Sequence, residues 1–134
     1  MDRRTFLTTC LIALGGAVGG LARYGVDLML AWHPPQFPWA TFWVNILGCI
    51  GIGAFLVWAL EGPATPWWLR PFVAIGVIGG FTTFSAFAAE NVLLADDGAL
   101  ATAGLYTAAM LTTGLIAVWM SATLTRRLLL PHGA

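Results

Sequence analysis

Four long apolar stretches, separated by short connectors, dominate the chain. An α-helix needs about 20 predominantly apolar residues to cross the roughly 30 Å hydrocarbon core of a bilayer, and each stretch is long enough. The expected spans are residues 5–30, 39–60, 69–94 and 100–124. The pattern therefore predicts an all-α membrane protein, with four transmembrane helices forming a single domain over residues 1–134.

The connectors between these stretches carry residues that stop helices. Residues 33–38 contain three prolines, which lack the backbone N–H that continues a helix. Residues 61–66 add a glycine and two more prolines. The last connector holds Asp96 and Asp97, either of which could cap the fourth helix. Connectors this short leave no room for an extramembrane domain, so we expect the function to lie within the bilayer.

The composition excludes two large classes of protein. Hydrophobic residues make up 59% of the 134 residues and charged residues 9%, against roughly 45–50% and 25% in soluble domains. Six arginines and six acids cancel, and there is no lysine. So few charges cannot coat a soluble domain, and a nucleic-acid-binding protein would need a basic face.

The N-terminal segment has two possible interpretations. Arg3 and Arg4 before an apolar run resemble a twin-arginine export signal. The apolar segment continues to Leu30, however, which is too long for the hydrophobic region of a signal peptide. We therefore expect a genuine first membrane helix.

Small residues recur at four-residue spacing on the first and fourth spans. The pairs are Gly15 with Gly19, Gly16 with Gly20, and Gly104 with Ala108. This spacing puts each pair on one helix face, where close backbone approach favours helix association in lipid. The pairs could serve packing within one subunit or a dimer interface. Because four spans enclose little interior, we expect an oligomer.

Polar side chains inside the spans are candidate functional residues, because lipid tolerates them poorly. Thr41 and Asn45 lie four residues apart and share a helix face. The Asn45 amide offers two N–H donors and a carbonyl, although one asparagine can also simply join helices. The sequence has no paired nucleophile and base and no metal-ligand cluster, so we do not expect an enzyme.

The third span holds the most informative segment, residues 79–87, which reads Gly-Gly-Phe-Thr-Thr-Phe-Ser-Ala-Phe. Each glycine costs a helix roughly 1 kcal/mol relative to alanine, so we expect the helix to unwind at mid-membrane, where Gly79-Gly80 is followed by Thr82-Thr83. A broken helix at this depth needs its freed carbonyls buried in protein or bound to an ion. The break could therefore be a packing kink or an ion site made of backbone oxygens.

Three segments together closely resemble the Fluc (CrcB) family of bacterial fluoride channels. They are residues 16–24, 41–48 and 79–87, which fall in the family's order on the first three spans, and the resemblance covers essentially the whole chain. It implies an antiparallel, dual-topology dimer in the cell inner membrane, with two fluoride pathways along the subunit interface. It also implies passive export of fluoride from the cytoplasm, which lowers its toxic concentration.

The resemblance also implies roles for individual residues. Asn45 would donate hydrogen bonds to fluoride, and the rings of Phe84 and Phe87 would line the pathway. The polar lining would comprise Thr41, Ser85, Glu90 and Tyr106, with Arg23 near the vestibule. Backbone carbonyls of Gly79 and Thr82 from both subunits would hold a structural Na⁺ on the dimer two-fold axis.

The residue types suit a small, tightly hydrated anion. Amide and hydroxyl donors can replace its water, and the positive edge of an aromatic ring can face it without trapping it. The chain departs from the family at Ala86, where threonine is common. It departs again at Met110 and Gly114, where the fourth span of close relatives carries serines.

Two other functions remain open at this stage. A small dual-topology, proton-coupled multidrug exporter would use a glutamate in its first helix, but the only charges within the first span are Arg23 and Asp27. A structural membrane subunit would use Asn45 and residues 79–87 for packing only. Measuring ion flux separates these classes.

Charge at the ends of the spans bears on the partner. The arginines on the side of both termini are Arg3, Arg4, Arg70, Arg126 and Arg127, and the first and third connectors have none. Such a bias favours cytoplasmic termini, whereas dual topology needs balanced charge. We expect a homodimer, with a heterodimer containing an oppositely oriented paralogue as the alternative.

Overall fold

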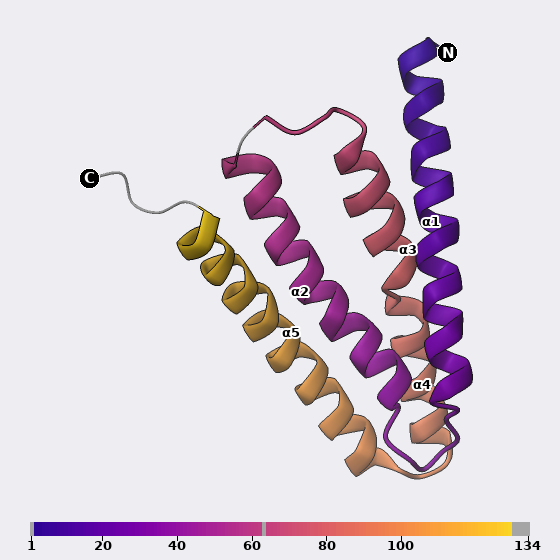
Figure 1. Ribbon diagram of the computed structural model, residues 1–134. Coiled ribbons are helices and arrows are strands. Elements are labelled where there is room, and N and C mark those ends of the chain that lie inside the picture. Colours follow the sequence, from indigo (N-terminus) through magenta and orange to yellow (C-terminus); the bar gives the residue numbers. More distant parts are fainter. Residues whose placement is uncertain (1, 63, 130–134) are drawn as a thin grey trace.

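The computed structural model describes residues 2–62 and 64–129, and all regular structure in that part of the chain is helical (Figure 1). The helices are α1 (Arg3–Met29), α2 (Trp39–Glu61), η1 (Pro71–Ile78), α3 (Gly79–Phe81), α4 (Phe84–Asp96) and α5 (Leu100–Leu129). Because η1, α3 and α4 follow one another as a single span, the described residues contain four helices that are long and apolar enough to cross a membrane. The predicted all-α, four-span architecture is confirmed.

The spans run up and down and pack as two pairs. The start of α1, the ends of α2 and α5, and the start of η1 lie at one end of the molecule (Figure 1). The α1–α2 and α4–α5 connectors lie at the other end (Figure 1). Within this arrangement α2 packs along α5, and α1 packs along η1 and α3. The third span therefore lies between α1 and the α2–α5 pair.

The buried core is small and lies toward the end with the two connectors. It comprises Phe42, Ile46, Leu94 and Tyr106, with Trp32 and Phe37 packed against it. Elsewhere large apolar side chains face outward, such as Leu115 at 74% exposure and Trp119 at 69%. A surface this apolar matches lipid as the surrounding medium.

Local capping sets several helix ends. The Asp2 carboxylate accepts a hydrogen bond from the Thr5 N–H at 2.7 Å, and this bond holds the pKa of Asp2 below its usual value. The expectation that Asp96 or Asp97 caps the fourth helix is wrong, because α5 begins at Leu100 and Ala99 precedes it, whereas Asp96 ends α4 and Asp97 is its C-cap. Gly98 follows with a φ of 77°, a conformation that glycine adopts without strain, and turns the chain toward α5.

The third span changes helix type and then breaks. In η1 the hydrogen bonds follow the wider π-helical pattern, and the chain then becomes extended at Thr82 and Thr83, with ψ angles of 156° and 117°. The predicted break of the third helix is therefore confirmed, and it lies at the two threonines and not at the glycines before them. Both glycines remain helical, as Gly79 shows with φ −65° and ψ −34°.

Close packing against α1 explains several of the glycines. A Cβ on Gly80 would lie 2.8 Å from the Gly16 Cα, and one on Gly19 would lie 2.7 Å from the Phe81 nitrogen. Gly15 approaches Gly76 equally closely. The pair Gly15 and Gly19 therefore serves packing within the chain, the first of the two roles considered for it.

Candidate functional site

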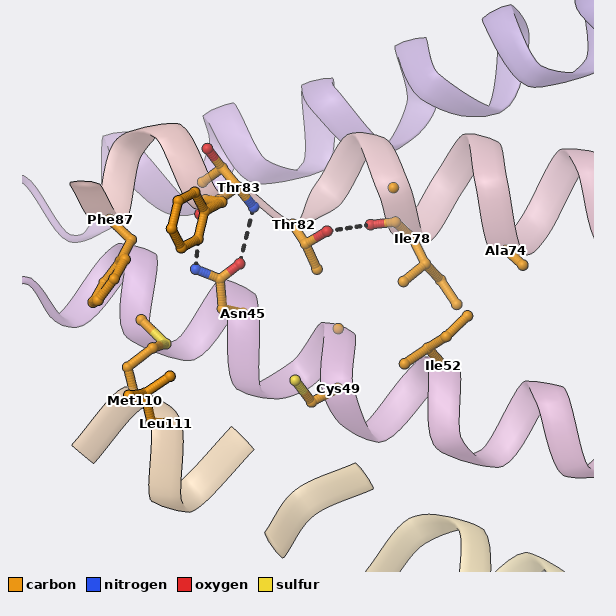
Figure 2. Close-up of a pocket in the computed structure, with 13 residues that line it drawn as sticks. Asn45, Cys49, Ile52, Ala74, Ile78, Thr82, Thr83, Phe87, Met110 and Leu111 are labelled. Carbon is orange, nitrogen blue, oxygen red and sulfur yellow. Dashed lines mark hydrogen bonds between the residues drawn. The ribbon is translucent and has the colours of Figure 1, made fainter. Parts of the chain in front are cut away.

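A groove of about 460 Å³ lies at the break in the third span, between that span, α2 and α5. Figure 2 shows Asn45 reaching from α2 toward the break, with Phe87 from α4 and Met110 from α5 nearby. Residues of this central groove that the sequence or the break singles out are Asn45, Gly79, Thr82, Thr83, Phe84 and Phe87. Five of these six were predicted as site residues, and the fold brings those five together.

The Asn45 side chain forms hydrogen bonds with the backbone at the break. Its Nδ2 donates to the Thr83 carbonyl at 3.0 Å, and its Oδ1 accepts from the Thr83 N–H at 2.9 Å (Figure 2). In lipid these backbone groups would otherwise be costly, because no water can satisfy them. An asparagine amide has two N–H hydrogens, and the Thr83 carbonyl takes one. Asn45 therefore joins two spans and keeps a second donor at the groove.

The break also leaves carbonyl oxygens without their helical donors, those of Gly79 and Thr82 among them. In a continuous helix the Thr83 N–H would bond to Gly79 and the Ala86 N–H to Thr82. Here Thr83 donates to Asn45, and Ala86 donates to the Thr83 hydroxyl at 3.1 Å. The carbonyls of Gly79 and Thr82 thus lose their helical donors, and both residues line the central groove. Carbonyl oxygens of this kind are suitable ligands for a hard cation.

The two predicted phenylalanines lie together at the groove. The ring centroids of Phe84 and Phe87 are 5.7 Å apart, and Phe87 also packs on Tyr106 at 5.1 Å. Phe84 is 78% exposed, so its ring faces away from the rest of this chain. One ring is thus supported by the core, whereas the other is presented outward.

Beyond Phe87 lies a buried polar cluster on three helices, the Glu90 cluster. Thr41 donates to Glu90 Oε1 at 2.6 Å, and the Tyr106 hydroxyl donates to Oε2 at 2.7 Å. Thr41 is 3% exposed and Tyr106 fully buried. The cluster brings together three predicted site residues, Thr41, Glu90 and Tyr106. The hydroxyl hydrogens of Thr41 and Tyr106 are both directed to the Glu90 carboxylate.

Two predicted site residues lie outside both the groove and the Glu90 cluster. Ser85 is exposed on α4, with its Oγ 3.2 Å from the Thr83 hydroxyl. Arg23 is half-buried on α1, and its Nε donates to the Gly80 carbonyl at 3.5 Å. Arg23 therefore ties α1 to the third span in this chain.

Sequence reasoning did not assign a role to one residue that shapes the groove. Thr83 was not named as a site residue, although its hydroxyl caps α4 and its backbone holds Asn45. A threonine three residues before Ala86 is a typical N-cap signal once a break is assumed. Met110, already noted from the sequence as a departure from the family, also lines the groove.

Comparison with known proteins agrees with this architecture. The family model described as "CrcB-like protein, Camphor Resistance (CrcB)" matches residues 10–122. The chain is 45% identical over 121 residues to "Fluoride-specific ion channel FluC 1" of Streptomyces coelicolor, covering 89% of this chain and 77% of the relative. It is 42% identical over 126 residues to "Fluoride-specific ion channel FluC" of Paracoccus denitrificans, covering 94% and 98%.

A third relative extends the range of organisms. The protein named "Fluoride-specific ion channel FluC" of Hyphomonas neptunium is 40% identical over 120 residues, which cover 88% of this chain and 94% of the relative. The similarity thus includes all four spans and the central groove. With four helices able to cross a membrane and matches over nearly its whole length, the chain belongs to the CrcB family of multi-pass membrane proteins.

Proposed function

We propose that this chain is a fluoride-selective ion channel, not an enzyme, and that it lets fluoride leave the cytoplasm passively and so lowers its toxic concentration. One observation carries the proposal: relatives 40–45% identical over most of the chain bear the name fluoride-specific ion channel. The donors and rings at the central groove support it, because they suit an anion that must bind without being trapped.

The pathway that we propose runs from the central groove past Phe84 and Phe87 toward the Glu90 cluster. The second N–H of Asn45 is the donor at its start, and the ring edges supply weak positive potential along it. The hydroxyls of Thr41 and Tyr106 would reach fluoride only by turning from Glu90, to which they donate. Ser85 and Arg23 complete the proposed lining, with Arg23 near its mouth.

A structural sodium ion is part of the same proposal. The released carbonyls of Gly79 and Thr82 support it, because side chains intercept the two N–H groups that would have bonded them. Each subunit would offer two oxygens, and two subunits related by a two-fold axis would offer four. When bound, the ion would supply positive charge that fixes the two breaks against each other.

The partner that we propose is a second copy of this chain, inserted in the opposite direction. The central groove opens at the surface of this chain, and Phe84 stands 78% exposed beside it. An antiparallel copy would cover that surface. It would also bring Asp96 and Asp97 at one end of the molecule near the arginines at the other end of its partner.

Fluoride efflux from liposomes containing the purified protein tests the function. We expect rapid passive fluoride efflux and almost no chloride efflux under the same gradient. Equal rates for the two anions would contradict fluoride selectivity. Proton-coupled exchange of organic cations would indicate a multidrug exporter instead, and no flux of any kind would indicate a structural subunit.

A further inference from the structure

A second polar bridge joins α4 to α5 beside the Glu90 cluster. The Thr107 hydroxyl donates to Asn91 Oδ1 at 2.9 Å, and Asn91 Nδ2 donates to the Phe87 carbonyl, also at 2.9 Å. Both side chains are half-buried within membrane-spanning helices. Neither residue lines the central groove or belongs to the proposed pathway.

The bridge fixes the orientation of the Asn91 amide. Its oxygen faces a hydroxyl that donates, and its nitrogen faces a carbonyl that can only accept. Turning the amide over would set its oxygen against the Phe87 carbonyl oxygen, so the arrangement has a single satisfied form. Thr107 is thereby connected through one rigid side chain to the backbone of Phe87.

The position of α4 depends mainly on its packing against α5. The break at Thr82 and Thr83 removes the helical hydrogen bonds that would have held the start of α4, and α4 packs mainly on α5. Two neighbouring pairs cross that contact, Glu90 with Tyr106 and Asn91 with Thr107. Adjacent residues project about 100° apart on a helix, so two such bonds together resist rolling of α4 about its axis.

We propose that Asn91 and Thr107 are positioning residues that hold the Phe87 ring in the fluoride pathway. The inference rests on the proposed function and deepens it. Phe87 packs on Tyr106 with ring centroids 5.1 Å apart, and this contact requires α4 to keep its roll. Removing the Thr107 hydroxyl leaves Asn91 Oδ1 without its donor, frees the amide and lets the Phe87 backbone shift. Neither positioning residue touches fluoride.

Fluoride efflux per dimer in liposomes is the first measurement. We expect Thr107→Val and Asn91→Leu each to lower it roughly three- to tenfold, the effect of losing one net hydrogen bond. Thr107→Ser keeps the hydroxyl and restores the wild-type rate. The double variant is no slower than Asn91→Leu alone, because both changes break one bridge.

Thr112→Val is the matched control on the same helix. Its hydroxyl is exposed and donates to the Ala108 carbonyl of its own helix, so its loss leaves efflux unchanged. Unchanged efflux in Thr107→Val and Asn91→Leu overturns the proposal. A loss explained wholly by less dimer in the membrane also overturns it, since a positioning role lowers the rate of assembled channels.

The second measurement follows the environment of the Phe87 ring directly. With 4-fluorophenylalanine at position 87, Thr107→Val shifts or splits the ¹⁹F resonance, whereas Thr107→Ser and Thr112→Val leave it as in wild type. The same label at Phe55 on α2 does not respond. An unchanged resonance at position 87 overturns the positioning role even where efflux falls. This measurement needs no conduction, so an absence of fluoride flux in the wild type would count against the channel function alone.

Discussion

At the scale of single residues, Asn45 has two roles that a side chain without an amide cannot fill. It satisfies both backbone groups of Thr83 and keeps one amide hydrogen at the central groove. We expect Asn45→Ala to abolish most fluoride efflux and to lower the unfolding temperature, since an unsatisfied buried backbone group costs about 1–3 kcal/mol. Efflux and thermal unfolding in detergent measure the two effects separately.

A suitable control for this change is Thr113→Ala. The Thr113 hydroxyl donates to the Ala109 carbonyl of its own helix and does not line the central groove. Thr113→Ala should therefore leave both fluoride efflux and the unfolding temperature near the wild-type values. Wild-type efflux in Asn45→Ala would reduce Asn45 to a residue that only joins helices.

Phe84 offers a test of ring electrostatics. Its ring is 78% exposed in the subunit, so Phe84→Ile removes little packing energy from the fold. The isoleucine is apolar and of useful size but lacks the positive ring edge, and we expect efflux to fall roughly tenfold or more while the dimer still assembles. Phe55→Ile, outside the groove, should conduct normally. Unchanged efflux in assembled Phe84→Ile would assign the ring to packing.

At the scale of helices, the sequence was informative about spans and less so about the break. The number of spans follows from counting the apolar runs that are long enough to cross a bilayer, and the required length is set by bilayer thickness alone. The break was expected where Gly79-Gly80 is followed by Thr82-Thr83, because glycine weakens helices, yet it falls on the threonines alone, and Gly80 stays helical and packs on Gly16. The side chains of Thr83 and Asn45 compete for the backbone N–H groups and fix the break. The Thr83 cap is a local signal, but the Asn45 contact joins residues 38 positions apart, so no local pattern contains it.

The glycines of α1 give a matched pair of adjacent residues. A Cβ on Gly19 would lie 2.7 Å from the Phe81 nitrogen, whereas one on Gly20 would meet nothing within 4 Å. Both alanines gain helix propensity of up to about 1 kcal/mol, but Gly19→Ala also overpacks the contact by about 1–3 kcal/mol. We expect a lower unfolding temperature for Gly19→Ala and an unchanged or higher one for Gly20→Ala. Equal shifts would show that α1 packs differently.

The proposed sodium site belongs to the same scale, because it consists of helix ends. Replacing sodium with N-methyl-D-glucamine should lower the unfolding temperature of the wild-type protein, since the carbonyls of Gly79 and Thr82 would lose their ligand. Thr82→Val removes a hydroxyl that donates to the Ile78 carbonyl and should keep this sodium dependence. Gly79→Leu would fill the groove and abolish it. An unfolding temperature of the wild-type protein that does not change when sodium is replaced would contradict the proposed site.

At the scale of the whole molecule, the chain predicts its own bundle but not its partner. The Glu90 cluster connects three helices through residues far apart in the sequence, so only the fold could reveal those contacts. In the proposed dimer the exposed Phe84 and the open groove would lie on the covered surface, because both are open to the surroundings in the single chain. Charge at the two ends of the bundle is the feature that bears on the partner.

The structure puts Arg3, Arg4, Arg70, Arg126 and Arg127 at one end of the bundle, and the connectors at the other end have none (Figure 1). This bias favours cytoplasmic termini, although two of the arginines are engaged within the chain. Arg126 binds Glu61 through both Nε and Nη2, and Arg4 lies 5.9 Å from the centre of a Trp67 ring. We expect enough copies to insert in each direction for the chain alone to form conducting antiparallel homodimers.

Labelling a single cysteine at the end of α5 measures the orientation directly. Leu129→Cys, in a chain with Cys10→Ser and Cys49→Ala, would be treated with a membrane-impermeant maleimide from each side of the membrane. Leu129 is 50% exposed, and the change leaves every arginine in place. We expect labelling from both sides together with fluoride efflux from the chain expressed alone. Labelling from the cytoplasmic side only, with no efflux, would exclude the homodimer, because a chain inserted in one direction needs an oppositely oriented paralogue to complete the pathway.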